Sequence, residues 1–379
     1  MMEVTFNENI KLIKMIPIYK PYFTRDSLKY AHDAIDSTWI SSHGKYLNLA
    51  EEKLKKITNS KYVILTNNGT AATHLVAWAL KYKYPNIQKL IVPSNVYIAA
   101  WNMFQTNPNY ELYPIDANLN TWNFDWKLDK FDYLLHKTTN RAVLVVHNIG
   151  NIINVPQMKE KYPDAIFIED NCEGFLGNYH GMPTGKASIA YSISFFGNKT
   201  ITSGEGGAFC TDDEEIYNEM NRVRAHGITS EKFVFNGMGY NYRMTNIQAA
   251  LLYGQLEILP EIVEKKQHIF STYKRELNNE LIHFMEIEEG VENPNWMFGV
   301  RFELSKDKMD KLQLHLHYND IETRPMFPPI NKHGHYNYFG EHFPISEQLY
   351  ETVLIFPSYP DLTETEVKYI CKTIKDFLK

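Results

Sequence analysis

The stretch Tyr62-Val63-Ile64-Leu65-Thr66-Asn67-Asn68-Gly69-Thr70 joins an apolar run to a polar turn, and residues 71–80 continue it with a helix-like pattern. This order of strand, turn and helix is typical of an α/β unit. The free amide groups at the start of such a helix can hold a phosphate, with the Thr70 hydroxyl as an extra donor. Helix capping explains the same residues equally well. The stretch therefore predicts the fold class and leaves both interpretations of the turn open.

The same alternation extends outward from this stretch. Between residues 60 and 212, short apolar runs alternate with helical patterns, which predicts parallel strands joined by crossover helices. We therefore expect an α/β fold with a mostly parallel central sheet flanked by helices. The further strand-like runs are residues 90–92, 110–116, 142–147, 165–170, 188–196 and 207–211.

The pattern changes beyond residue 245, where a long helical stretch reaches about residue 278 and Pro260 predicts a kink or break. After it, residues 297–304 are strand-like, and residues 306–317 and 364–378 are helical. This mixture indicates a smaller α+β domain. We expect a large domain over residues 1–250 and a smaller C-terminal domain over residues 251–379.

Composition excludes several classes of protein. The 379 residues carry a net charge of only -6 and are 14% aromatic, which disfavours disorder and a nucleic-acid partner. Cys172, Cys210 and Cys371 lack the paired spacing of a zinc site or a disulfide framework, which indicates a reducing, cytoplasmic setting. Residues 1–15 lack the apolar core of a signal peptide, and no window is apolar enough to span a membrane.

Two acids stand at the end of a predicted strand. The run Ile166-Phe167-Ile168 delivers Glu169 and Asp170 at its carboxyl end, where open parallel sheets place their ligands. A buried carboxylate there needs a cationic partner, and a protonated pyridine nitrogen would supply one. A structural role for the acid is equally compatible with the spacing.

Lys199 lies between two predicted strands in a loop rich in glycine and serine. Most lysines are solvated surface residues, which is the simplest interpretation of a single lysine. The apolar neighbours Phe195 and Phe196 and the glycines at 204, 206 and 207 instead favour a partly desolvated pocket close to the backbone. In such a pocket an amine can act as a nucleophile.

Four ordered strings resemble the DegT/StrS family of sugar aminotransferases. They are T-N-N-G-T-A-A at residues 66–72, I-E-D-N-C-E-G at 168–174, S-F-F-G-N-K-T-I-T-S-G-E-G-G at 194–207 and G-Y-N-Y-R-M-T-N-I-Q-A-A at 239–250. The resemblance extends from about residue 16 to the C-terminus. It implies a fold type I enzyme that uses pyridoxal phosphate, with two active sites at the interface of a homodimer.

The resemblance also implies individual roles. Lys199 matches the lysine that forms a Schiff base with the cofactor, and Asp170 matches the partner of the pyridine nitrogen, a division of labour expected for such enzymes. Glu173 matches a position near the ring hydroxyl. The other implied cofactor contacts are Tyr97, which would stack on the ring, Gly69, Thr70 and Ser194 at the phosphate, and Asn241, which would reach the phosphate of the neighbouring subunit.

The acceptor is less sharply defined by these motifs. The strings around Lys199 and Asn241 resemble the perosamine-synthase branch of the family, which implies L-glutamate as amino donor and a nucleotide-linked 4-keto-6-deoxy sugar as acceptor, for surface polysaccharide. Trp101 and residues 148–151 depart from the usual pattern, and Trp101 is either core or a residue that narrows the site toward a small phosphorylated ketone such as dihydroxyacetone phosphate.

Three further interpretations remain. Arg243 and Arg324 are candidates for binding a carboxylate or phosphate of the substrate, because a guanidinium offers a planar pair of donors. The histidine pairs at residues 315/317 and 333/335 lack the spacing of known zinc motifs, so we expect no metal. A non-catalytic sensor or scaffold is the alternative to an enzyme, although Lys199 and Asp170 are both retained.

Overall fold

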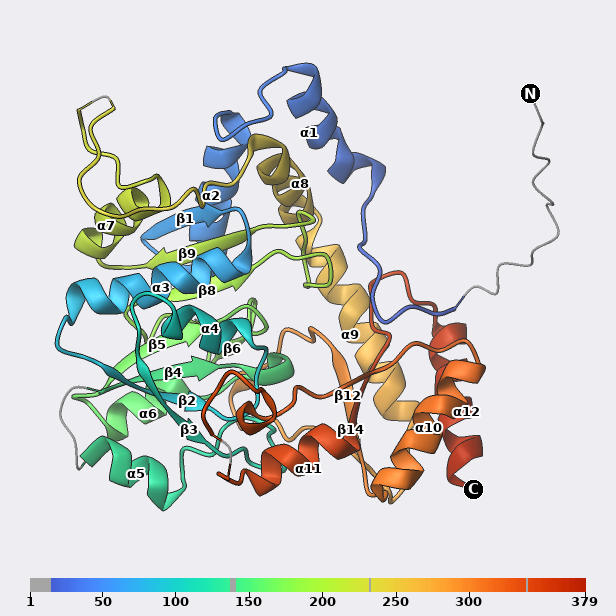
Figure 1. Cartoon of the computed structure of the whole chain (residues 1–379). Helices are drawn as coiled ribbons and strands as arrows, with labels where there is room; N and C mark the ends of the chain where they lie inside the picture. The colour runs from blue at the N-terminus through green and yellow to red at the C-terminus, as the bar shows by residue number, and fades with distance from the viewer. Residues whose placement is uncertain (1–14, 137–140, 232, 339) are drawn as a thin grey trace, which may run out of the picture.

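The computed structural model describes residues 15–136, 141–231, 233–338 and 340–379. The prediction about a signal peptide concerns residues that lie almost entirely outside these ranges. A seven-stranded sheet forms the centre of the molecule, in the order β1-β9-β8-β5-β4-β2-β3 (Figure 1). Its strands are β1 (Tyr62–Thr66), β2 (Lys89–Pro93), β3 (Glu111–Ile115), β4 (Arg141–Val146), β5 (Ile166–Asp170), β8 (Tyr191–Ser194) and β9 (Gly207–Thr211).

The strand directions confirm a mostly parallel sheet and correct one expectation. The pairs β3–β2, β2–β4, β4–β5 and β5–β8 are parallel. β9 runs antiparallel to both of its neighbours, β8 and β1. A parallel return from β8 would need a crossover, usually a helix, and the loop over residues 195–206 contains none. The chain therefore reverses through the loop that carries Lys199.

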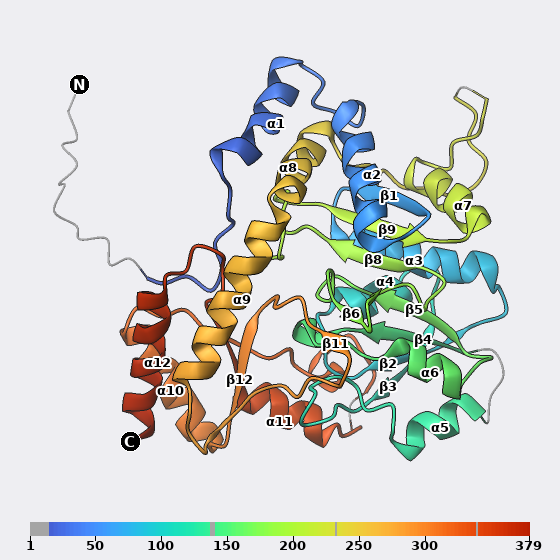
Figure 2. The ribbon, with the colours of Figure 1, turned by 180° about the vertical axis from the view of Figure 1, so that it is seen from behind.

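Helices cover both faces of this sheet. One face carries α3 (Gly69–Lys83), α4 (Ala99–Gln105) and α7 (Glu214–Arg224), as Figure 1 shows. The opposite face carries α2 (Lys45–Thr58), α5 (Asp129–His136) and α6 (Val155–Lys161), seen from behind in Figure 2. α1 (Arg25–Asp36) lies outside α8 (Asn246–Glu257), which also packs on that opposite face. Apolar strand residues are buried on both faces, as a parallel sheet requires.

Two consecutive helices lead from the large sheet to a second one. α8 ends at Glu257 and α9 (Leu259–Glu276) begins after a single intervening residue, with Pro260 in its first turn, so the predicted break is at this proline. A four-stranded antiparallel sheet follows, in the order β10-β12-β14-β13. It comprises β10 (Ile282–His283), β12 (Phe298–Phe302), β13 (Arg324–Pro325) and β14 (Val353–Phe356), with α10 (Lys306–Tyr318), α11 (Pro344–Thr352) and α12 (Glu364–Leu378) around it.

A third, three-stranded sheet joins the two halves of the chain. It pairs β6 (Asn178–Tyr179) with β7 (Met182–Pro183) and with β11 (Val291–Glu292). The predicted boundary between residues 250 and 251 falls inside α8, and we retain the division into a large and a smaller domain as a proposal. No helix among the described residues is long and apolar enough to span a membrane.

Candidate active site

A cavity of about 400 Å³ opens at the carboxyl ends of β1, β4, β5 and β8. Residues from β13, β14 and the segment before β12 line its other side, so the cavity lies between the two larger sheets. This is the position at which open α/β sheets bind ligands. The sequence-predicted residues that line it are Gly69, Thr70, Tyr97, Asp170, Glu173, Ser194, Lys199 and Arg324.

Asp170 is the last residue of β5 and is only 6% exposed. Its Oδ1 accepts a hydrogen bond from the Cys172 amide at 3.0 Å, and its Oδ2 accepts one from the Thr73 hydroxyl at 3.3 Å. These two donors fix the orientation of the carboxylate. No cation forms an ion pair with Asp170 among the described residues, so its charge is available to a cationic group within the cavity.

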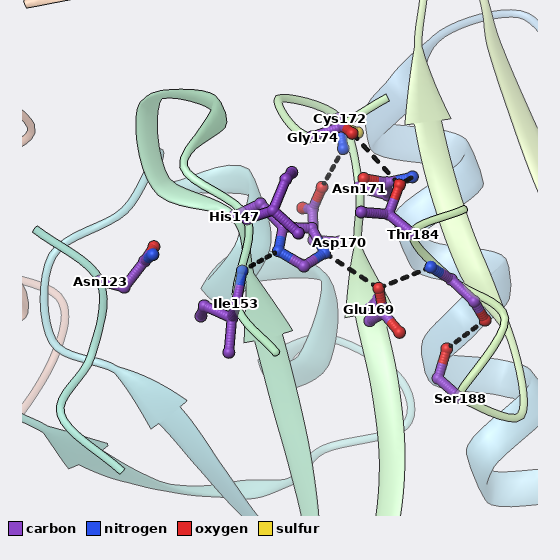
Figure 3. A network of polar contacts seen from close by, with 12 residues as sticks. Asn123, His147, Ile153, Glu169, Asp170, Asn171, Cys172, Gly174, Thr184 and Ser188 are labelled. Atoms are coloured by element: carbon purple, nitrogen blue, oxygen red, sulfur yellow. Dashed lines mark hydrogen bonds and ion pairs between the residues drawn. The ribbon is translucent and has the colours of Figure 1, made fainter. Parts of the chain in front are cut away.

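The side chain before Asp170 supports it from the other face of β5. Glu169 is buried and its Oε2 lies 2.9 Å from His147 Nε2 (Figure 3). His147 Nδ1 accepts the Ile153 amide at 3.1 Å, so the ring proton is on Nε2 and is donated to Glu169. The Gly185 amide donates to the same carboxylate oxygen at 2.8 Å. This network connects β4, β5 and the loop after β7, and holds the end of β5 in place.

Lys199 is partly buried, and its amine lies over an indole ring. Lys199 Nζ is 4.0 Å from the centroid of Trp296, which precedes β12 and is 4% exposed. A partly desolvated cation–π contact of this kind is worth about 1–2 kcal/mol. No carboxylate forms an ion pair with Lys199 within the described ranges, so the amine is held in the cavity without a salt bridge.

The start of α3 forms a second polar corner of the cavity. Asn68 is the N-cap, and its side chain accepts the Ala71 amide, which leaves the first amides of the helix without an intrahelical partner. Ser194 lies close enough that a Cβ on Gly69 would be 2.6 Å from Ser194 Cβ and 2.7 Å from Ser194 Oγ. Only glycine fits there. Asn68 therefore caps the helix, while Gly69 and Thr70 face the cavity, and the binding of a phosphate at this turn stays a prediction.

Glu173 is buried beside these groups. Its Oε2 accepts the Ile149 amide at 2.8 Å, and Ile149 has a left-handed backbone with φ of 53°. Burial raises the pKa of Glu173 to about 7, partly offset by the charge of Lys199 and by the amide hydrogen bond. Glu173 can therefore carry or release a proton near neutrality.

Aromatic and cationic residues form the mouth of the cavity. Tyr97 is 59% exposed and its ring meets Phe327 at a centroid distance of 6.0 Å. Arg324 is exposed, and its guanidinium lies 3.5 Å from Glu322. This edge of the site can therefore present one guanidinium and two aromatic faces to a substrate.

Two predicted residues lie outside this cavity. Asn241 and Arg243 lie on the segment before α8; Asn241 is exposed and Arg243 is half-buried, and Arg243 Nε donates to Asn241 Oδ1 at 3.1 Å. The segment bridges to β1 through Thr66 and Arg243, and its Tyr242 carbonyl accepts the Asn67 amide at 2.8 Å. A single chain therefore does not bring Asn241 or Arg243 to the groups around Lys199.

The two departures from the usual family pattern have different places. Trp101 is fully buried, and its indole Nε1 donates to the Pro93 carbonyl at 2.9 Å, so it belongs to the core. Ile149, within residues 148–151, does line the cavity. The flanking Asn148 donates from Nδ2 to the carbonyls of Asn95 and Trp122, both at 3.0 Å, which fixes that turn.

Trp296 and Asn198 were not predicted from the sequence as site residues. Trp296 comes from a part of the chain with no motif, and only the packing of the second sheet brings it to Lys199. The Oδ1 atom of Asn198 is buried at the cavity without a partner among the described residues, which marks it as a free acceptor for a bound molecule. The only sequence feature that could have predicted Asn198 is its position next to Lys199. In the same ranges, no cluster of residues suitable for a metal is found.

The cavity fits a phosphorylated pyridine aldehyde. It contains an unpaired carboxylate, an amine, a helix N-terminus with a glycine where a side chain would collide, and an unpartnered amide oxygen. The α/β fold and this set of groups define the class of pyridoxal-phosphate enzymes of fold type I.

A family model described as the DegT/DnrJ/EryC1/StrS aminotransferase family matches residues 21–375, and the chain belongs to this family. Membership confirms the predicted enzyme class, an aminotransferase, and its cofactor, pyridoxal phosphate.

Named relatives agree with this assignment. The chain is 33% identical over 368 residues to the GDP-perosamine synthase of Escherichia coli O157:H7, covering 96% of this chain and 99% of the relative. It is 30% identical to the GDP-perosamine synthase of Vibrio cholerae, with the same coverage of 96% and 99%. The structure of PseC of Helicobacter pylori, an aminotransferase involved in the biosynthesis of pseudoaminic acid, matches with a TM-score of 0.87 at 21% identity, over 96% of this chain and 99% of PseC. This last likeness supports the fold.

Proposed function

We propose that the protein transfers the amino group of L-glutamate to the ketone of a nucleotide-linked 4-keto-6-deoxy sugar, for surface polysaccharide. The observation that carries the proposal is the meeting of Lys199 and Asp170 in one cavity with the start of α3. The likeness to two GDP-perosamine synthases supports the acceptor class. A sensor or scaffold would not need an unpaired amine and an unpaired carboxylate facing one cavity.

Each side chain has a proposed task in holding the cofactor. Asp170 binds the ring nitrogen, oriented by the donors from Cys172 and Thr73. The first amides of α3, at Gly69 and Thr70, bind the phosphate together with Ser194. Tyr97 covers one face of the ring, Glu173 lies near its hydroxyl, and Lys199 binds its aldehyde carbon. Once bound, pyridoxal phosphate supplies an electron-accepting ring that stabilises negative charge beside the donor's α-carbon.

Lys199 has the second task of moving a proton. Displaced by the amino donor, its amine takes the proton from the donor's α-carbon and returns it at the cofactor's carbon. Trp296 keeps this side chain within the cavity while it carries the proton, because an aromatic face attracts an ammonium group and offers no base. The Asp170 carboxylate accepts a hydrogen bond from the ring nitrogen, which favours the protonated ring.

The acceptor enters from the edge that carries Arg324, Tyr97 and Phe327. A guanidinium suits a phosphate of the nucleotide part, and the aromatic faces suit the sugar ring. Trp101 lies in the core, so it does not narrow the cavity toward a small ketone. This favours the nucleotide-linked sugar over dihydroxyacetone phosphate.

The proposal includes a homodimer in the cytoplasm. Asn241 is exposed and Arg243 half-buried, and both lie outside their own cavity, as expected of residues that complete the site of a second copy. The free cysteines are consistent with a reducing compartment.

An acceptor screen tests this function. Purified protein with pyridoxal phosphate and L-glutamate is offered nucleotide-linked 4-keto-6-deoxy sugars and dihydroxyacetone phosphate side by side, and 2-oxoglutarate is measured. We expect a higher kcat/KM for one of the nucleotide sugars, and no turnover in Lys199→Ala. A higher kcat/KM for dihydroxyacetone phosphate would overturn the acceptor. A protein with no near-visible cofactor band and no turnover would overturn the enzyme assignment.

A further inference from the structure

Lys266 is a fully buried lysine on α9 that the chemistry described above does not use. Its Nζ donates to the Ser358 carbonyl at 2.7 Å. Among the residues that the structure describes, no carboxylate forms an ion pair with it, and burial lowers its pKa to about 7. Burying an amine without a counter-ion costs stability, so its surroundings indicate what it does.

The Lys266 amine lies over the ring of Tyr19, 5.4 Å from the ring centroid. The hydroxyl of that ring donates to the backbone carbonyl of Lys199 at 2.6 Å. Lys266 therefore contacts one face of a side chain whose other end fixes the peptide unit of the predicted cofactor lysine. In its protonated form the amine is attracted to the π-system of the phenol ring and draws electron density from it, which strengthens the hydroxyl as a donor.

The neighbouring carbonyl is fixed in the same way from another direction. Trp296 Nε1 donates to the Asn198 carbonyl at 2.9 Å, while the Trp296 ring carries the Lys199 amine. Two consecutive carbonyls, of Asn198 and Lys199, thus each accept a hydrogen bond from an aromatic side chain distant in sequence. The backbone on which the Lys199 side chain pivots is held on both sides.

The segment that carries Tyr19 is also tied to the mouth of the cavity. The Ile18 amide donates to Glu322 Oε2 at 2.8 Å, and Ile16 bridges to Ile321. Glu322 stands two residues before Arg324, which lines the cavity. In Figure 2 the segment before α1 runs beside α9, where Lys266 lies. Tyr19 therefore lies between α9, the Lys199 loop and the substrate edge.

We propose that Tyr19 and Lys266 are positioning residues for Lys199, with the buried amine fixing the Tyr19 ring and the Tyr19 hydroxyl fixing the Lys199 carbonyl. This rests on the proposed role of Lys199 as the cofactor lysine. Without the hydroxyl, the Lys199 carbonyl loses its partner and the loop gains freedom. The amine then spends less time where it can take the proton, whereas the groups that bind donor and acceptor stay in place.

The chain offers a matched control one residue away. Lys265 Nζ lies 4.9 Å from the ring centroid of Tyr22, and the Tyr22 hydroxyl bonds to Glu261 on the same helix. This second lysine–tyrosine pair is nearer the surface, and among the described residues neither of its side chains donates a hydrogen bond to the Lys199 loop. The test variants are Tyr19→Phe, Lys266→Met and their combination, and the controls are Tyr22→Phe and Lys265→Met.

Two readouts distinguish positioning from general stability. In the cofactor-free protein, we expect faster amide hydrogen exchange over residues 196–206 in both test variants and not in the controls. In the loaded enzyme, kcat should fall about tenfold in Tyr19→Phe, as expected for one lost hydrogen bond of about 1.4 kcal/mol, with little change in the KM for glutamate. The kcat of Lys266→Met should fall less. The kcat of the double variant should be no lower than that of Tyr19→Phe, because both substitutions act through the same contact with the Lys199 carbonyl.

Several results would overturn the proposal. One is equal exchange and equal kcat in Tyr19→Phe and Tyr22→Phe, and another is additive losses in the double variant. Tyr19→Phe keeps the ring and its packing, so it carries the test even where Lys266→Met fails to fold. Failure of the proposed function is separately visible, because the unaltered protein would then show no near-visible cofactor band and no turnover with any acceptor.

Discussion

Single residues in the cavity are held by donors that leave their chemistry free. Asp170 accepts two hydrogen bonds and Lys199 rests on an indole, yet neither forms an ion pair among the described residues. A charge partner within the protein would compete with the cofactor for each of them. The carboxylate of Asp170 and the amine of Lys199 are therefore both available to a ligand in the cavity.

Asp170→Asn tests the charge with little change of shape. The asparagine oxygen can still accept the Cys172 amide, so we expect the fold to persist while the support for a protonated ring nitrogen is lost. Turnover with glutamate should fall more than about tenfold, or 1.4 kcal/mol. Thr73→Val, which removes one donor and keeps the charge, should lose less. A loss below tenfold in Asp170→Asn would contradict the role of its charge.

Glu173→Gln tests the raised pKa through stability. Between pH 4.5 and about 7 the folded protein keeps a proton on Glu173 that the unfolded chain releases, so the free energy of unfolding falls as pH rises. Glutamine does not titrate and still accepts the Ile149 amide. The free energy of unfolding of the variant should exceed that of the unaltered protein by up to about 3 kcal/mol at about pH 8, and by almost nothing near pH 4.5.

The measurement for Glu173→Gln is the melting temperature of the cofactor-free protein across this pH range. Glu160→Gln, on the exposed face of α6, is the control and should follow the unaltered protein at every pH. A constant offset between Glu173→Gln and the unaltered protein would show that burial does not raise the pKa of Glu173.

Some site residues were predictable from a local sequence pattern, whereas others come to the Lys199 loop from distant parts of the chain. Asp170 was predictable because a short apolar strand delivers it to the sheet edge, and Lys199 because its loop is flanked by two such strands. Trp296 and Tyr19 meet the Lys199 loop from 98 and 180 residues away. Their contacts depend on how the second sheet and the first segment pack, which no local pattern encodes.

Among the elements, α3 connects the fold to the proposed phosphate site at its N-terminus most directly. Asn68 caps the helix, so the next amides face the cavity, and β8 brings Ser194 against Gly69. The close approach of strand and helix is possible because Gly69 has no side chain. One methyl group at this place would push α3 and β8 apart.

Gly69→Ala is therefore expected to weaken cofactor binding. Its Cβ would lie 2.6 Å from Ser194 Cβ, closer than two such carbons can stand, so the first turn of α3 must move. We expect the Kd for pyridoxal phosphate, measured by fluorescence titration, to rise at least about tenfold. Gly334→Ala, with open space around its Cβ, should bind as the unaltered protein does. Equal Kd values would contradict the phosphate assignment.

Strands were the most predictable elements, and their directions were not. Each predicted run of the large sheet became a strand, and most of its apolar residues are buried. β9 runs antiparallel to β8 because the connection between them contains no helix. The pattern of apolar residues alone does not reveal this direction. The two-residue strands β6, β7 and β11 are too short to give any pattern.

For the whole molecule, a homodimer is the expectation with the sharpest test. If Asn241 serves the site of the other subunit, a chain with Lys199→Ala and a chain with Asn241→Asp are each inactive alone. In their mixed dimer, one site has Lys199 from one chain and Asn241 from the other. Random mixing should then restore about a quarter of the normal activity.

The mixed-dimer experiment is read by unfolding and refolding the two variants together and measuring turnover. Refolding each variant separately, then combining them without exchange, is the control and should give no recovery. Lack of recovery in a mixture shown to contain hybrid dimers would mean that Asn241 does not act across the interface.

The hold of Trp296 on the Lys199 loop has a consequence for the order of events during synthesis. When the ribosome has translated about residue 250, the chain already contains the sequence of all seven strands of the large sheet, together with Asp170 and Lys199. The indole that carries the amine and fixes the Asn198 carbonyl has yet to emerge. Domains fold largely in the order in which they are made. We therefore expect tight binding of pyridoxal phosphate only after the second sheet has been made and has folded. Incomplete chains should then not bind this reactive aldehyde.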